Sequence, residues 1–251
     1  MSPIVLSAGI FLLTVGGIFL GSLLRDALPR HHLNKDAQDV VRLGVGLIAT
    51  MAALVVGLLI AAAKNSFDTQ SGQVRQITAD VVLLDNLLSQ YGPEAAPLRA
   101  EIRTAIPLFA DRLWSEKASD ATAPYEASLA VEKVYVEIQS LAPQNDLQRS
   151  LQARAIEAST DIARARLLLF TERGNSIPLP FLGVLALWLI IIFASFSLFS
   201  GLNATVFISL ALFALSSSCA IYLILELGRP FTGLMMISSA PLRDALGPLS
   251  P

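Results

Sequence analysis

The side chains best suited to chemistry lie in a short polar stretch near the N-terminus. His31 and His32 are adjacent, and Asp26, Asp36 and Asp39 lie close by in the sequence. Imidazole and carboxylate groups are common metal ligands. However, neighbouring residues on a helix point about 100° apart, and no histidine at i+4 completes a shared ligand face. We therefore expect solvated or interfacial histidines and no metal site. The alternative is pH sensing at a pore mouth, because imidazole titrates near neutral pH.

The rest of the chain carries no catalytic signature. The sequence contains no G-x-S-x-G, no H-E-x-x-H and no glycine-rich phosphate loop. Its one cysteine, Cys219, lies in an apolar run, so an intrachain disulfide and a structural thiolate zinc site are both excluded. The net charge of −2 argues against a nucleic-acid partner. We expect a protein that is not an enzyme and that uses no cofactor.

The composition is that of a membrane protein. Of the 251 residues 54% are hydrophobic and 15% are charged, whereas soluble domains carry about 25% charged residues. Most of the charge falls between residues 26 and 42 and between 64 and 173. The uncharged runs are each about as long as a bilayer span requires. No basic residue precedes the first run, which favours a retained span over a cleaved signal peptide. The predicted spans are residues 4–24, 43–63, 177–199 and 205–225.

The second span has two different helical faces. Residues spaced by three or four share a face of a helix, and small residues allow helices to approach closely in lipid. One interpretation is a buried helix of a bundle, and the other is a helix that lines the pore of an oligomer. In the second case Leu54 and Leu58 would form an apolar constriction and Thr50 a ring of hydroxyl groups. The small face comprises Gly46, Thr50, Ala53, Gly57 and Ala61, and the bulky face Leu47, Met51, Leu54 and Leu58.

Polar residues lie on both sides of this second span. In the pore interpretation they would surround the two mouths, where they are mixed in sign. The sign of a conducted ion is therefore not readable from them. The candidate lining residues are Leu47, Thr50, Met51, Leu54 and Leu58, and the candidate mouth residues are His31, His32, Arg42, Lys64, Asn65 and Asp68.

Residues 64–176 predict a helical, water-exposed domain. Val74, Ile77, Val81, Leu84 and Leu88 repeat at three and four, so the second span should continue as one long amphipathic helix. Apolar residues at similar helical spacing come after this helix, and no stretch shows the alternation of apolar and polar residues that is typical of a strand. The chain should break at the glycine and proline of residues 92–93, kink or split at the proline of residue 107, and form a new capped helix at residue 145 or 146.

The fold class predicted is an all-α membrane protein with four transmembrane helices in two hairpins. The helical soluble domain is inserted between transmembrane helices 2 and 3. Gly17 and Gly21 form a G-x-x-x-G pair in the first span, which indicates a close helix contact. Glu226 and Arg229, three residues apart, either form a local ion pair or lie at headgroup level. The predicted segments are 1–63 (first hairpin), 64–176 (soluble domain), 177–225 (second hairpin) and 226–251 (C-terminal tail).

The distribution of basic residues predicts the orientation. Four spans place both termini and the soluble domain on one side of the bilayer. Seven Lys and Arg residues flank the membrane on that side or lie in the tail, against four in the loop of residues 25–42. Because cytoplasmic segments carry an excess of Lys and Arg, we expect a multi-pass protein of the inner (plasma) membrane with a cytosolic soluble domain.

Three stretches resemble a family of bacterial membrane proteins labelled bestrophin-like. They are Leu28–Gln70, Leu83–Glu94 (LLDNLLSQYGPE) and the tail Leu223–Leu246. The resemblance implies a distant similarity to bestrophins, which are pentameric anion channels with four spans per chain and a pore lined by the second span. This chain has no acidic calcium-binding cluster of the bestrophin kind near its end and no aromatic residue in its second span. Anion selectivity and calcium gating are therefore not carried over.

Two functions are consistent with these observations. The first is an oligomeric ion channel of bestrophin-like type, with the lipid bilayer and further copies of the chain as partners and ions passing along the second span. The resemblance implies a pentamer. The second is a membrane-anchored helical interaction or sensor protein that does not conduct. A transporter would need polar groups at mid-membrane, and none of the four spans has a charge near its middle.

Overall fold

The computed structural model describes residues 2–29, 34–114, 133–172, 179–201 and 203–245. Over these ranges the chain is helical and contains no strand, which confirms the all-α prediction. The chain divides into two compact units. The first unit comprises Met1–Ser66 and Ser176–Gly228, and the second comprises Phe67–Asn175 and Arg229–Pro251.

Within the described ranges, four helices are long and apolar enough to cross a membrane. They are α1 (Pro3–Ala27), α2 (Lys35–Tyr91), α6 (Leu179–Ser200) and α7 (Ala204–Leu227). Each of the four predicted spans overlaps one of these helices over the described residues. The helix α2 has 57 residues and is common to both units, so the prediction of one helix continuing past the second span is confirmed.

Local sequence signals set the ends of these helices. Ser2 caps α1, because its side chain accepts a hydrogen bond from the Val5 N–H, and Pro3 occupies the first turn. The side chain of Asn34 caps α2 by accepting from the Ala37 N–H at 2.8 Å. The short connection after α6 contains Gly201, whose φ of 68° is a conformation that glycine adopts without steric cost.

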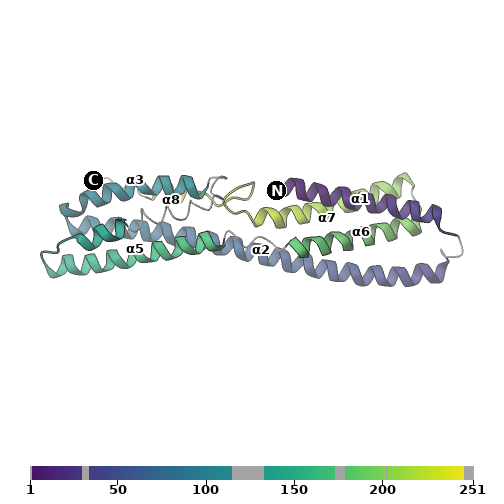
Figure 1. Cartoon of the computed structure of the whole chain (residues 1–251), viewed down its shortest axis with the longest axis horizontal. Helices are drawn as coiled ribbons and strands as arrows, with labels where there is room; N and C mark the ends of the chain where they lie inside the picture. Colours follow the sequence, from purple (N-terminus) through teal and green to yellow (C-terminus); the bar gives the residue numbers. More distant parts are fainter. Residues whose placement is uncertain (1, 30–33, 115–132, 173–178, 202, 246–251) are drawn as a thin grey trace. The chain divides into compact units, whose positions relative to one another are not determined.

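In the first unit, α1 packs along α6 and also contacts α7 (Figure 1). The approach to α6 is close at the two glycines predicted to form a helix contact. A Cβ atom at Gly17 would lie 3.1 Å from the carbonyl oxygen of Ile190, and one at Gly21 would overlap the carbonyl of Ala194. The G-x-x-x-G contact is therefore confirmed, and its partner is α6.

The second unit is built around the C-terminal part of α2. After α2, Gly92 adopts a φ of 129° and the 3₁₀ turn η2 (Pro93–Ala95) leads into α3 (Ala96–Leu113). Residues 133–140 are helical, and α5 (Asp146–Glu172) comes next. The side chain of Asn145 caps α5 by accepting from the Gln148 N–H at 2.8 Å. The core of this unit includes Ile77, Val81, Leu88, Leu113, Ile138 and Leu169.

Of the two outcomes expected at Pro107, a kink or a split, the split is wrong, because α3 runs unbroken from Ala96 to Leu113. The kink stays a prediction. An internal proline removes one backbone hydrogen bond and costs about 3 kcal/mol. Here Ile102, Ala110 and Leu113 on the buried face of α3 pack into the core on both sides of the proline. Burial of each such side chain contributes about 1–3 kcal/mol, which offsets the lost bond.

Most of the predicted C-terminal tail, Arg229–Pro251, belongs to the second unit. Its short helix α8 (Ala240–Asp244) contacts α3, and Leu242 is fully buried. The indole N–H of Trp114 donates to the carbonyl of Ile237 at 2.7 Å, and its ring meets that of Phe231 edge-on. The tail is thus held to the end of α3 by an aromatic contact and a hydrogen bond.

Candidate pore-forming face of helix α2

The membrane-length apolar segment of α2 is less buried than those of α1, α6 and α7. In the most apolar 18-residue segment of α2, 17% of the residues are buried, compared with 28 to 33% in the corresponding segments of α1, α6 and α7. Along one side it packs in the first unit, where Ala52 and Val56 belong to an apolar cluster with Ile10, Leu182 and Ile221. Val45 and Ala63 of the same helix are also buried, whereas much of the rest of its surface in this unit is exposed.

The candidate lining residues lie on this uncovered surface. Leu47, Met51, Leu54 and Leu58 are each between 46 and 66% exposed, values unusual for large apolar side chains in water. Thr50 is also exposed, and its hydroxyl donates to the carbonyl of Leu47 at 2.7 Å. The oxygen of Thr50 therefore keeps its lone pairs available on the exposed side.

The glycines of α2 serve no packing contact within the described chain. A Cβ atom added to Gly44, Gly46 or Gly57 would have no atom within 4 Å, unlike one at Gly17 or Gly21 in α1. Gly9 and Gly16 of α1 are open in the same way, so openness alone is not specific to α2. What distinguishes α2 is that its open glycines belong to a longer exposed face, which also includes Thr50, Ala53 and Ala61.

The candidate mouth residues are only partly brought together. Arg42 lines a small cavity of about 130 Å³ with Gln38 and Val45 of α2 and with Ser195 and Ser200 of α6. Near the other end of the span, three polar residues lie on α2, namely Lys64, Asn65 and Asp68. His31 and His32 lie outside the described residues. Among the described residues no group of histidine, cysteine and acidic side chains is arranged to hold a metal ion.

The ion pair expected between Glu226 and Arg229, at the end of α7, stays a prediction. Glu226 is 4% exposed and lies one residue before the end of the helix, and Arg229 comes after the capping Gly228. A carboxylate buried to this extent needs polar partners. The local pair with Arg229 and a position at headgroup level both stay predictions.

One ionic cluster in the second unit was missed by the sequence reasoning. The Arg99 guanidinium donates to both carboxylate oxygens of Asp85, at 3.0 and 2.9 Å, and Arg103 donates to one of them at 3.2 Å. Burial raises the pKa of Asp85, but the two guanidinium groups lower it by more, so the pKa lies below its ordinary value. Arg99 and Arg103 are four residues apart and share a helix face, which is the signal that was available.

Comparison with known proteins agrees with the membrane-protein assignment. Residues 12–242, most of the chain, match a family model described as Bestrophin-like domain. Searches of curated proteins and of solved structures found no match. The family match spans both units and includes residues of all four apolar helices.

Proposed function

Because the chain belongs to the bestrophin-like family, we propose that it is one subunit of a homo-oligomeric ion channel whose pore is lined by α2. Copies of the chain would surround a central axis, with the exposed face of α2 turned toward that axis and toward the neighbouring copies. The resemblance to bestrophins favours a pentamer. The chain would lie in the inner membrane with the second unit in the cytosol, an orientation that the excess of Lys and Arg favours.

The observation that carries this proposal is the exposed face of α2. Its glycines and its large apolar side chains are both left uncovered in a single chain. Small residues at a membrane helix surface favour close helix packing, which has no use at a surface that meets only lipid. A second copy of α2 supplies the missing contact, and a ring of copies brings the bulky face of each helix toward one centre.

The proposed pore has an apolar gate. Leu54 and Leu58 are one helical turn apart, so copies of each would form two adjacent rings near the middle of the span. Such rings exclude water when they are narrow and conduct when they widen. Thr50 and Met51 would lie next to them on one side. Polar residues at the two ends of the span, among them Arg42 and Lys64, would meet ions before and after the gate.

The segment boundaries proposed for this channel are those of the sequence analysis. Residues 1–63 and 177–225 would form the two transmembrane hairpins, and residues 64–176 the inserted helical domain. Residues 226–251 would be a tail on the cytosolic side, carried by the second unit to which Arg229–Pro251 belongs.

The test is single-channel recording on the purified full chain in planar bilayers. We expect discrete currents from the wild type and larger or longer openings from Leu54→Ser and Leu58→Ser, because a hydroxyl side chain favours wetting of the gate. Leu12→Ser is the matched control, since Leu12 of α1 is 68% exposed but lies outside the proposed pore. Absence of current from the wild type and from both gate variants would leave only the non-conducting, membrane-anchored alternative.

A further inference from the structure

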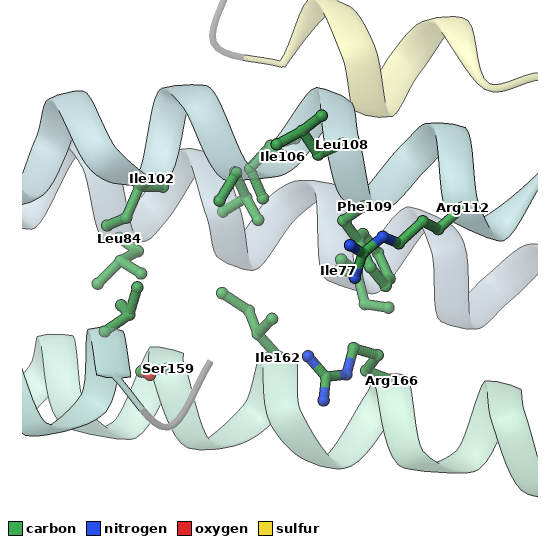
Figure 2. Close-up of a pocket in the computed structure, with 13 residues that line it drawn as sticks. Ile77, Leu84, Ile102, Ile106, Leu108, Phe109, Arg112, Ser159, Ile162 and Arg166 are labelled. Atoms are coloured by element: carbon green, nitrogen blue, oxygen red, sulfur yellow. The ribbon is translucent and has the colours of Figure 1, made fainter. Parts of the chain in front are cut away.

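Two cavities of the molecule differ in what their charged groups can still bind. In the second unit, α2, α3 and α5 form most of the wall of a largely apolar cavity of about 250 Å³ (Figure 2). Arg112 and Arg166 line it, but both already interact with other groups. In the first unit, Arg42 lines a smaller cavity of about 130 Å³ between α2 and α6. Among the described residues, none forms a hydrogen bond or ion pair with the Arg42 side chain, not even Asp39 one turn before it.

The smaller cavity lies at the polar end of two apolar helices. Arg42 is the last charged residue before the uncharged run of residues 43–63, and Ser200 is the last residue of α6. Arginine side chains at the end of a membrane span reach the level of the lipid headgroups. Phe196, which also lines the cavity, is 48% exposed, and we expect it to meet acyl chains. The cavity is therefore placed where a phospholipid headgroup can enter it.

The hydrogen-bond donors of the cavity come from α2. The guanidinium group of Arg42 matches a phosphate in charge and in the geometry of its oxygens. Gln38 lies one turn before Arg42 and lines the same cavity, so its side-chain amide can donate a further hydrogen bond. No aspartate or glutamate is among the described residues of the lining. A phosphate at this wall therefore meets donors and no competing carboxylate.

The hydrogen-bond acceptors of the cavity come from α6. The hydroxyl group of Ser195 donates to the carbonyl of Ile191 at 2.7 Å, and that of Ser200 donates to the carbonyl of Phe196 at 2.6 Å. Because each hydroxyl hydrogen is used within the helix, the two serine oxygens keep lone pairs that can accept from a ligand. This wall of the cavity therefore suits a ligand group that donates hydrogen bonds.

We propose that this cavity binds the headgroup of phosphatidylethanolamine from the surrounding bilayer. The phosphate meets Arg42 and Gln38, and the ammonium group donates to the oxygens of Ser195 and Ser200. Pockets that enclose a whole small molecule span about 300–1,000 Å³, so a cavity of about 130 Å³ holds the headgroup and leaves the acyl chains outside, along Phe196. Because Arg42 is also a proposed mouth residue, the bound phosphate would neutralise its charge there.

The test is native mass spectrometry of the full chain, delipidated in detergent and titrated with lipids that have the same acyl chains. Phosphatidylethanolamine and phosphatidylcholine have the same net charge, but the choline group has no N–H to donate. We expect the first phosphatidylethanolamine to bind about threefold or more tightly than the first phosphatidylcholine, as for one hydrogen bond. Phosphatidylglycerol should bind less tightly than phosphatidylethanolamine, because its hydroxyl groups are neutral donors.

Two variants separate the two walls of the cavity. Arg42→Gln should weaken the binding of both zwitterionic lipids by about tenfold, as expected for the loss of a charge-assisted hydrogen bond. Ser195→Ala combined with Ser200→Ala should abolish the preference for phosphatidylethanolamine and leave phosphatidylcholine binding unchanged. Lys35→Gln is the matched control, since it removes an exposed positive charge from α2 two turns before Arg42 and outside the cavity.

The proposal fails if the wild type binds the two zwitterionic lipids equally or not at all, or if Lys35→Gln weakens binding as much as Arg42→Gln does. Tighter binding of phosphatidylglycerol than of phosphatidylethanolamine would also overturn it, because the positive charges at this end, Arg25 among them, would then explain the binding. Elution volume and helix content show whether each variant folds, and the comparison of lipids on the wild type needs no variant. Binding is measured without current, so the result does not depend on whether the chain is a channel.

Discussion

At Gly21 the backbone of α1 lies against the carbonyl group of Ala194 in α6, with no room for a side chain. We expect Gly21→Ala to lower the free energy of unfolding by about 1–3 kcal/mol, because the added methyl group forces the two helices apart. The same change at Gly16, where a Cβ atom meets nothing within 4 Å, should be neutral or slightly stabilising.

Unfolding by sodium dodecyl sulfate, followed by circular dichroism, measures both glycine variants. If Gly21→Ala and Gly16→Ala behave alike, the close approach of α1 to α6 is not what Gly21 provides. A loss of stability in Gly16→Ala alone would indicate that the close helix contact lies on the other side of α1.

Asp85 makes the second unit sensitive to acid. The pKa of Asp85 is lowered in the folded state, so the ionised carboxylate stabilises the fold above about pH 4, the unfolded value. That stabilisation is lost as the pH falls through the lower folded-state pKa. We expect Asp85→Asn to be less stable than the wild type by about 1–3 kcal/mol at pH 7, with the difference shrinking toward pH 3.

Guanidinium unfolding of the full chain between pH 3 and 7 measures this difference. The chain has two tryptophans, Trp114 and Trp188, so a Trp188→Phe background makes the emission report on the second unit. Asp161→Asn is the control, because the Asp161–Arg164 pair is exposed and contributes about 0–1 kcal/mol. A difference between Asp85→Asn and the wild type that does not change with pH would contradict the role assigned to this carboxylate.

At the scale of the elements, the tail depends on one residue at the end of α3. Trp114 bonds the carbonyl of Ile237 and contacts the ring of Phe231, whereas Asp111 contributes only a partly exposed pair with Arg243. We expect Trp114→Ala to release the tail to proteolysis after Arg243. Asp111→Asn should leave the cleavage rate almost unchanged, since exposed ion pairs contribute little.

Limited trypsin digestion of the purified protein, with mass analysis of the fragments, compares the two tail variants. Equal protection of the tail in Trp114→Ala and in the wild type would show that other contacts hold it. Faster cleavage in Asp111→Asn than in Trp114→Ala would assign the main role to the ion pair.

Much of the helical layout is set by local sequence signals. The unbroken α2 was predictable because no glycine–proline pair interrupts its apolar repeat before residues 92–93, and the cap at Asn145 is expected from its side chain. The sequence left open whether the helix continues through Pro107 with a kink or splits there, because the outcome depends on burial against other helices. Periodicity also identifies exposed candidates on α2. It does not predict that Arg112 and Arg166, which lie on different helices, line the same cavity, because that depends on how the helices pack.

At the scale of the whole molecule, the exposed apolar surface of the first unit needs two kinds of cover. We expect the lipid bilayer to cover large exposed side chains such as Leu12 and Leu212. We expect other copies of the chain to cover the small-residue face of α2, so mass photometry of nanodiscs should find several copies per particle. Gly57→Phe should lower the copy number, because a bulky side chain prevents close packing, whereas Gly72→Phe, in the second unit, should not. A single copy per particle in the wild type would contradict the oligomer.

The most direct test asks whether residue 54 faces the path of the ions. Cys219 is the one cysteine of the chain, so Cys219→Ser gives a cysteine-free background for Leu54→Cys and for the control Leu12→Cys. Single-channel current is recorded before and after a charged methanethiosulfonate reagent is added. The account predicts that the reagent changes the conductance of Leu54→Cys in steps, one for each modified subunit, and leaves Leu12→Cys unchanged. Currents that persist unaltered in Leu54→Cys, although mass spectrometry shows the cysteine modified, would contradict a pore lined by α2.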